Sequence, residues 1–159
     1  MDRFCGYLSK MRKLIEIFND IFSNADFLRV KNDFFLEGQG VVIVINLQKS
    51  SYDNIYFVNI GIWINVIGGC NNRPKENACH IKFRADTLLP IMHPDIDFGR
   101  MFVGNIESNQ EREVYNSLSE YMLPLVRSIS SLDSVKIMFK QGYFNSALVR
   151  KEARDLLNV

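Results

Sequence analysis

The sequence is poor in cysteine, has a single tryptophan and carries no excess of charge. Its 159 residues include 3 cysteines, 19 basic residues and 18 acidic residues. A small, odd number of unevenly spaced cysteines argues against a secreted disulfide framework, so we interpret Cys5, Cys70 and Cys79 as free thiols. A nearly neutral chain has no global field that would attract nucleic acid or an anionic membrane. A charged partner would therefore have to be bound by a local patch.

Long uninterrupted apolar runs are also missing. The longest one, residues 55–67, contains Asn59 and Asn65 and is shorter than the roughly 20 residues that cross a bilayer as a helix. Residues 1–13 scatter charges among apolar residues and contain no signal-peptide core. We therefore predict a cytoplasmic protein without a membrane partner, folded as a single domain over residues 1–159.

The usual motifs of catalysis are absent as well. There is no G-x-S-x-G elbow, no reactive-cysteine signature and no glycine-rich phosphate loop before a helix. Zinc-ligand residue types occur at Cys70, Cys79, His80 and His93, but Cys79 and His80 are adjacent on a predicted strand and would point to opposite faces. We predict that the chain is not an enzyme and binds no cofactor.

A second group of potential metal ligands follows at His93, Asp95 and Asp97. In an extended segment this two-residue spacing would aim the three side chains to one side, as a hard or borderline metal requires. The alternative is a loop rich in proline and aspartate with solvated carboxylates. We favour the loop, because no further acidic ligands are close in the sequence, and we predict no metal site.

The residues that are present predict an α+β fold. Apolar residues at three- and four-residue steps indicate an amphipathic helix over residues 4–22. A short hairpin with its turn near Asn32 and Asp33 follows, then long alternating strands and a C-terminal half with helical periodicity, in which Pro124 kinks a helix or begins a new one. We expect an N-terminal helix, an antiparallel sheet of about four to five strands and C-terminal helices. The strands are expected at 41–49, 55–67 and 79–85, a loop at 68–78, an irregular segment at 88–99, and helices at 114–129, 131–141 and 146–157.

The strands separate their side chains onto two faces. One face is apolar and is predicted to pack on the helices; it comprises Ile45, Val58, Ile60, Ile62, Ile81 and Phe83. A register that keeps these apolar sides together pairs Ile45 with Val58 and Asn46 with Phe57. It also sets Asn65 near His80, Trp63 near Lys82 and Gly61 near Arg84. The second face carries Asn46, Gln48, Asn59, Trp63, Asn65, His80, Lys82 and Arg84.

Four segments in order resemble a known family. They are FLRVKNDFF, VVIVINLQKSS, FVNIGIW and CHIKFR, and together they are similar to the bacterial domain-of-unknown-function 4304 family over about residues 25–84. The resemblance implies a small bacterial α+β protein and no established activity. Uncharacterised small bacterial domains are sometimes encoded beside secreted toxins as immunity proteins, and the resemblance suggests this role by association only.

Asparagine has a low strand propensity, so the asparagines on the second face conflict with the local preference for strand structure. This conflict suggests a binding role. We predict a protein-binding module, in its specific form an immunity protein that neutralises a toxin, with Trp63 and Arg84 as anchors. One alternative is an enzyme or small-ligand protein with a pocket between the sheet and the C-terminal helices, using His80 or residues 93–97. Another is a weak nucleic-acid binder that stacks bases on Phe57 and Trp63. The structural alternative is a polar face that is solvated or covered by a helix.

Overall fold

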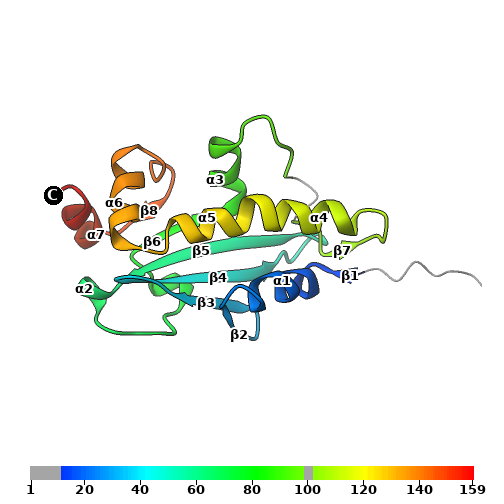
Figure 1. Cartoon of the computed structure of the whole chain (residues 1–159), viewed down its shortest axis with the longest axis horizontal. Helices are drawn as coiled ribbons and strands as arrows, with labels where there is room; N and C mark the ends of the chain where they lie inside the picture. The colour runs from blue at the N-terminus through cyan, green and yellow to red at the C-terminus, as the bar shows by residue number, and fades with distance from the viewer. Residues whose placement is uncertain (1–11, 99–101) are drawn as a thin grey trace, which may run out of the picture.

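The computed structural model describes residues 12–98 and 102–159 as an α+β protein with an antiparallel sheet (Figure 1). The main sheet has six strands in the order β2-β3-β4-β5-β6-β8, and β1 and β7 form a separate two-stranded sheet. The strands of the main sheet are β2 (Leu28–Val30), β3 (Asp33–Glu37), β4 (Val41–Lys49), β5 (Tyr56–Ile64), β6 (Ile81–Arg84) and β8 (Leu148–Val149). The small sheet consists of β1 (Arg12–Lys13) and β7 (Asn105–Ile106).

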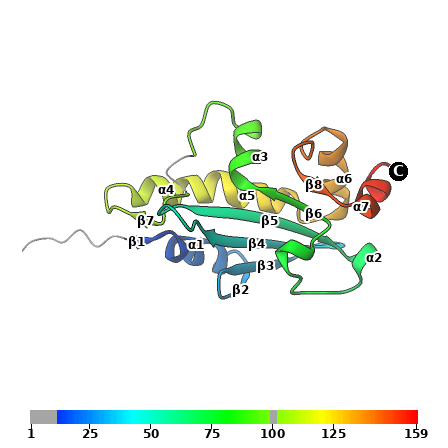
Figure 2. The same cartoon turned by 180° about the vertical axis from the view of Figure 1, so that it is seen from behind.

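Helices cover one face of the main sheet. The first is α1 (Leu14–Ser23), and the second is a continuous rod made of α4 (Glu111–Ser117), η3 (Leu118–Met122) and α5 (Leu123–Ser128). Both lie on the same side of β4 and β5 (Figures 1 and 2). The remaining helical segments are α2 (Asn65–Gly68), η1 (Glu76–Ala78), α3 (Ala85–Met92), α6 (Leu132–Lys140) and α7 (Lys151–Leu157).

The hydrophobic core lies between this helical layer and the apolar face of the sheet. Phe18 and Phe22 of α1 stack with their ring centroids 5.0 Å apart, and both rings lie 6.0 Å from that of Phe34 in β3. The predicted core face is confirmed, because all six of its residues are buried: Ile45, Val58, Ile60, Ile62, Ile81 and Phe83. Period-two patterning was enough to assign these residues to the core.

The long rod changes its hydrogen-bonding pattern before Pro124. The five residues Leu118–Met122 form a π-helical turn, and α5 begins at Leu123 with Pro124 in its first turn. Proline lacks an N–H and crowds the preceding turn, so a local π-turn is a common way to continue a helix past it. The prediction that Pro124 perturbs this helix or begins a new one is therefore confirmed.

The predicted N-terminal helix begins later than expected. Residues 4–11 lie outside the described residues, whereas Arg12 and Lys13 pair with β7 as a strand. Arg12 forms ion pairs with Glu111, at 2.6 Å, and with Asp20. The hydrogen bonds that the Arg12 guanidinium donates to these two carboxylates raise its pKa. The extended backbone at Arg12 thus ties the start of α1 to α4.

The predicted register is wrong by two residues in both strand pairs. Ile45 faces Ile60, and Asn46 faces Asn59, because the loop between β4 and β5 is wider than the one we expected. Ser50 Oγ accepts hydrogen bonds from the backbone N–H groups of Tyr52 and Asp53, which holds this wider loop. A shift of two residues keeps every side chain on its face, so the core prediction survives the error.

Several element boundaries also differ from the sequence predictions. Strand β5 ends at Ile64, and Asn65 begins the single helical turn α2, so Asn65 is not a strand residue. Residues 85–92 form α3, which buries Ala85, Leu88 and Leu89, where we expected a strand to end at 85 and an irregular segment to begin at 88. The predicted helix at 146–157 begins instead with β8, which adds a strand to the edge of the sheet. Within the described ranges, no helix is long and apolar enough to cross a bilayer.

Candidate functional site

The second face of the sheet is divided into a covered part and an open part. This face lies on the side of the sheet opposite α1 and α4–α5, and the loop that follows α2 crosses over part of it (Figure 2). We call residues 69–80 the covering loop. Asn46 of β4, Asn59 of β5 and Arg84 of β6 are direct cross-strand neighbours. Asn46 and Asn59 border the η1 part of the covering loop. We call the part of the second face that extends from these residues away from Trp63 the open face; it comprises Asn46, Gln48, Phe57, Asn59 and Arg84.

The covering loop is held by close packing and by two hydrogen bonds from the sheet. Trp63 Nε1 donates to Gly69 O at 2.9 Å, and Lys82 Nζ donates to Asn77 O at 3.3 Å. Cys79 is buried directly over Gly61, where an added β-carbon would lie 2.7 Å from the Cys79 sulfur. Burial raises the pKa of the Cys79 thiol to about 12, so the thiol stays protonated and unreactive at neutral pH.

His80 ends the covering loop in the interior of the protein. It is 4 % exposed, and its ring centroid lies 4.6 Å from that of Trp63. Its Nδ1 accepts a hydrogen bond from the backbone N–H of Ile64 at 2.8 Å, which requires Nδ1 to be unprotonated. Burial lowers the pKa of His80, and the nearby Arg150 lowers it further. The ring is therefore neutral at pH 7 and serves the packing of this end of the sheet.

The structure separates the predicted partner residues into two groups. Asn46, Gln48, Asn59 and Arg84 lie together on the open face. Trp63, Asn65 and His80 belong to the covered end of the sheet, and Lys82 lies half-buried at the boundary. The predicted pairs Trp63–Lys82 and Gly61–Arg84 are wrong, because Gly61 faces Lys82 and Arg84 faces Asn59. The guanidinium of Arg84 consequently lies far along the strand from the indole.

The asparagines of the strands form a hydrogen-bonded ladder. Asn46 Nδ2 donates to Asp33 Oδ1 at 2.6 Å, and Asn59 Nδ2 donates to Asn46 Oδ1 at 3.3 Å and to Gln48 Oε1 at 3.0 Å. These cross-strand bonds compensate for the low strand propensity of asparagine. The amide nitrogen of Gln48 forms no hydrogen bond with another described residue, so the exposed end of the ladder offers free donors.

The guanidinium of Arg84 lies over an aromatic ring of the open face. Its guanidinium carbon lies 4.1 Å from the ring centroid of Phe57, within the range of a cation–π contact. Its Nε and Nη2 donate to the two carboxylate oxygens of Asp86 at 3.0 and 2.7 Å. The remaining Nη1 makes no bond to another described residue, and the side chain is 44 % exposed.

An apolar hollow of about 370 Å³ lies beside this pair. Its lining includes Ile55, Ile96 and Phe98 next to Phe57. The side chains of Ile55 and Ile96 are exposed to solvent. The partner-surface prediction omitted Phe57, although the alternation of β5 places it on the polar face. An aromatic residue on an otherwise polar strand face was the signal that could have identified it.

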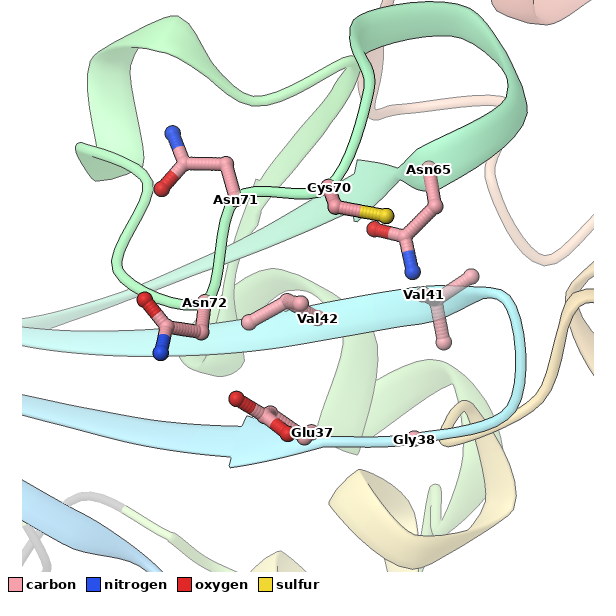
Figure 3. Close-up of a pocket in the computed structure, with 8 residues that line it drawn as sticks. All are labelled: Glu37, Gly38, Val41, Val42, Asn65, Cys70, Asn71 and Asn72. Carbon is pink, nitrogen blue, oxygen red and sulfur yellow. The ribbon is translucent and has the colours of Figure 1, made fainter.

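A second hollow lies at the opposite end of the second face, between the end of β3, the start of β4 and the covering loop (Figure 3). Its volume is about 440 Å³. Val41 and Val42 line it with buried apolar side chains, and the polar residues around them come from three different elements. These polar residues are Glu37, Asn65, Cys70, Asn71 and Asn72.

The residues that we considered as metal ligands do not gather at either hollow. Cys70 lines one hollow and Asp97 lines the other. In the part of the chain that the structure describes, no group of three or more His, Cys, Asp or Glu side chains is placed to hold a metal ion. His93 packs edge-on against Tyr121, with ring centroids 4.8 Å apart. Cys70 is an exposed free thiol and Cys79 a buried one, and Cys5 lies outside the described residues.

Comparison with known proteins identifies the family. A family model described as "Domain of unknown function (DUF4304)" matches residues 18–128. Searches of curated proteins and of solved structures gave no match. The family match includes most of α1, β2 to β6 and the whole helical rod, and therefore extends beyond the segments at 25–84 that suggested it. The chain belongs to the DUF4304 family, whose function is unknown.

Proposed function

We propose that this chain is a protein-binding module and that the open face contacts the partner. The observation that carries the proposal is the Phe57–Arg84 pair, with the guanidinium 4.1 Å above the ring and beside a hollow of about 370 Å³. Aromatic and arginine side chains next to a pocket are the most common anchors of protein interfaces. The proposal requires no catalytic residue.

The geometry favours binding because the anchor is already ordered. The guanidinium is fixed by its two hydrogen bonds to Asp86 and by the ring of Phe57, so little side-chain entropy is lost when a partner binds. Arg84 Nη1 can then donate to a carbonyl or carboxylate of the partner. Asn59 and Gln48 supply amide groups at the rim, and the hollow can receive one apolar side chain.

A toxin is the specific partner class that we propose. Neutralising a toxin requires only that the open face covers the toxin's own working surface, and a small binding module suffices for that purpose. The partner would present an apolar side chain to the hollow and an acceptor to Arg84. Protection of cells by the wild-type chain, and loss of protection in Arg84→Ala, is the expected result when the chain and its toxin are produced together.

Affinity purification with matched variants tests the general proposal. Phe57→Ala and Arg84→Ala should each weaken binding of the captured partner by about 2 kcal/mol, as central anchors do. Tyr115→Ala and Arg127→Ala remove an aromatic residue and an arginine from exposed positions of the helical rod and should bind like wild type. Affinities are measured by calorimetry with the purified partner, and melting temperatures verify the fold. Equal affinity of all four variants for the partner contradicts the proposal. The proposal is also contradicted if Phe57→Ala and Arg84→Ala weaken binding only to single-stranded nucleic acid.

A further inference from the structure

A third hollow lies next to the open face, at the edge of the main sheet where β6 meets β8 (Figure 1). Its volume is about 320 Å³. We call it the edge hollow; its lining includes Asn59, Glu76, Lys82, Arg84, Ser146 and Leu148. Leu148 is 58 % exposed, and Arg84 and Ser146 are exposed as well. The edge hollow therefore presents side chains that a second molecule can contact.

Two positively charged side chains converge beside the edge hollow on one neutral group. Lys82 Nζ donates to Asn77 O at 3.3 Å, and Arg150 Nη2 donates to the same oxygen at 3.5 Å. A backbone carbonyl carries no net charge that would balance them. Neither Lys82 nor Arg150 forms an ion pair with another described residue. Their charges are therefore available to a partner.

The carboxylates around the edge hollow offset only part of this positive charge. Asp86 is paired with Arg84 at 2.7 Å and is not available to other cations. Glu76 is half-buried and forms no ion pair with a described residue. Burial raises the pKa of Glu76, and the positive charge of Lys82 opposes that rise. Lys82 and Arg150 thus face one carboxylate, and one additional carboxylate from a partner would balance them.

The edge hollow and the apolar hollow beside Phe57 share one wall, because Arg84 lines both. Phe57 lines the apolar hollow and Asn59 lines the edge hollow, and these two residues of β5 are about 7 Å apart along an extended strand. A single extended segment that crosses Arg84 can therefore reach both hollows. One part of the segment would meet apolar side chains and the other part would meet unpaired positive charges.

We infer that the partner binds the open face with an acidic, extended polypeptide segment. This partner chemistry rests on the proposed protein-binding function. An apolar side chain enters the hollow beside Phe57, and a carboxylate about two to four residues away receives charge-assisted hydrogen bonds from Lys82 and Arg150. Nucleic acid fits this surface less well, because Glu76 and Asp86 would repel a continuous row of phosphates.

Selection from a random dodecapeptide library displayed on phage, with the whole chain as bait, tests this partner chemistry. Peptides that bind wild type but not Phe57→Ala should carry Asp or Glu within a few positions of an aliphatic or aromatic residue. Selection on Arg150→Gln should keep the apolar residue and lose the enrichment of acidic residues. Phe57-dependent peptides without acidic enrichment overturn the partner chemistry and leave the protein-binding proposal standing. Recovery of no Phe57-dependent peptide overturns both.

One selected acidic peptide and a copy with Gln in place of its acidic residue make the test quantitative. In fluorescence anisotropy, Arg150→Gln and Lys82→Gln should each weaken the acidic peptide about three- to fivefold, as loss of one exposed ion pair does, and leave the Gln copy unchanged. Arg127→Gln is the matched control, because Arg127 is exposed on the helical rod, and it should bind like wild type. Melting temperatures verify the fold of each variant. Equal losses for both peptides, or tighter binding of oligothymidylate than of the acidic peptide, overturn the assignment.

Discussion

A single methyl group at position 61 should displace the covering loop. Gly61 lies in the middle of β5, and a β-carbon there would come within 2.7 Å of the Cys79 sulfur, 2.9 Å of the Cys79 β-carbon and 3.3 Å of the Glu76 carbonyl oxygen. Carbon atoms in van der Waals contact lie about 3.5 to 4.0 Å apart, so Gly61→Ala forces Cys79 and its loop outward. The backbone at Cys79 has to move, because its β-carbon cannot rotate away.

Two opposing effects set the size of the change. Replacing glycine by alanine inside a strand removes a backbone entropy cost of about 0.5 to 1 kcal/mol. Overpacking of a tight interior costs about 1 to 3 kcal/mol. The clash involves the buried Cys79 on both of its side-chain atoms, so we take the upper half of that range and expect a net loss of about 1 to 2 kcal/mol in the free energy of unfolding. For a chain of this length, that loss lowers the melting temperature by about 3 to 6 °C.

Urea unfolding tests this prediction when Gly61→Ala is made both in the wild-type chain and in the Cys79→Gly variant. Cys79→Gly removes both atoms that clash, so the cost of Gly61→Ala should nearly vanish in it, giving a coupling of about 1 kcal/mol or more. Trp63 is the only tryptophan, and its indole N–H bonds to Gly69 O, so its emission should shift to the red when the loop moves. A Gly61→Ala variant as stable as wild type, or one that loses the same free energy in both backgrounds, would falsify the close-packing argument.

Two further predictions concern the core and the buried histidine. Ile60→Ala should lower the free energy of unfolding by about 2 to 5 kcal/mol because Ile60 is fully buried, whereas Asn59→Ala on the other face should cost under about 1 kcal/mol; urea titrations of both variants compare the faces. Stability should fall as pH drops below the ordinary pKa of 6.5, because unfolded His80 then binds a proton that the folded ring, with its lowered pKa, resists. Unfolding at about pH 5.5 and 7.5 measures this effect. His80→Asn keeps an acceptor near the Ile64 N–H and should show a weaker dependence; an equal dependence would assign the effect to other groups.

The parts of the fold that were predicted correctly are those fixed by hydrophobic period. The bounds of β4 and the burial of Ile45, Ile60 and Ile62 follow from alternation alone. The register does not follow, because a two-residue slip keeps the same faces and leaves the hydrophobic pattern equally satisfied. In the structure the Ser50 hydroxyl accepts two hydrogen bonds within the wider loop, and a serine in a loop gives no such information before the structure is known.

Local patterns were least informative where tertiary contacts decide the structure. We predicted an irregular segment at 88–99, yet the burial of Leu88 and Leu89 supports a helix up to Met92 that includes Pro90. Strand β8 has two residues and exists because β6 offers an unpaired edge, so it has no period to detect. The position of the covering loop depends on Cys79 meeting Gly61 across the sheet, a contact that composition cannot predict.

The two-residue difference in register also changes which aromatic residue can anchor a partner. In the predicted register Arg84 lay beside Gly61, and Trp63 was its aromatic neighbour. In the structure Arg84 lies beside Asn59 and over Phe57, while Trp63 bonds to the covering loop and packs on His80. Trp63 therefore fastens the loop to the sheet, and Phe57 becomes the aromatic half of the anchor. The asparagine ladder joins β3, β4 and β5 through side-chain hydrogen bonds and does not require a covering layer. The open face is therefore free to contact a partner.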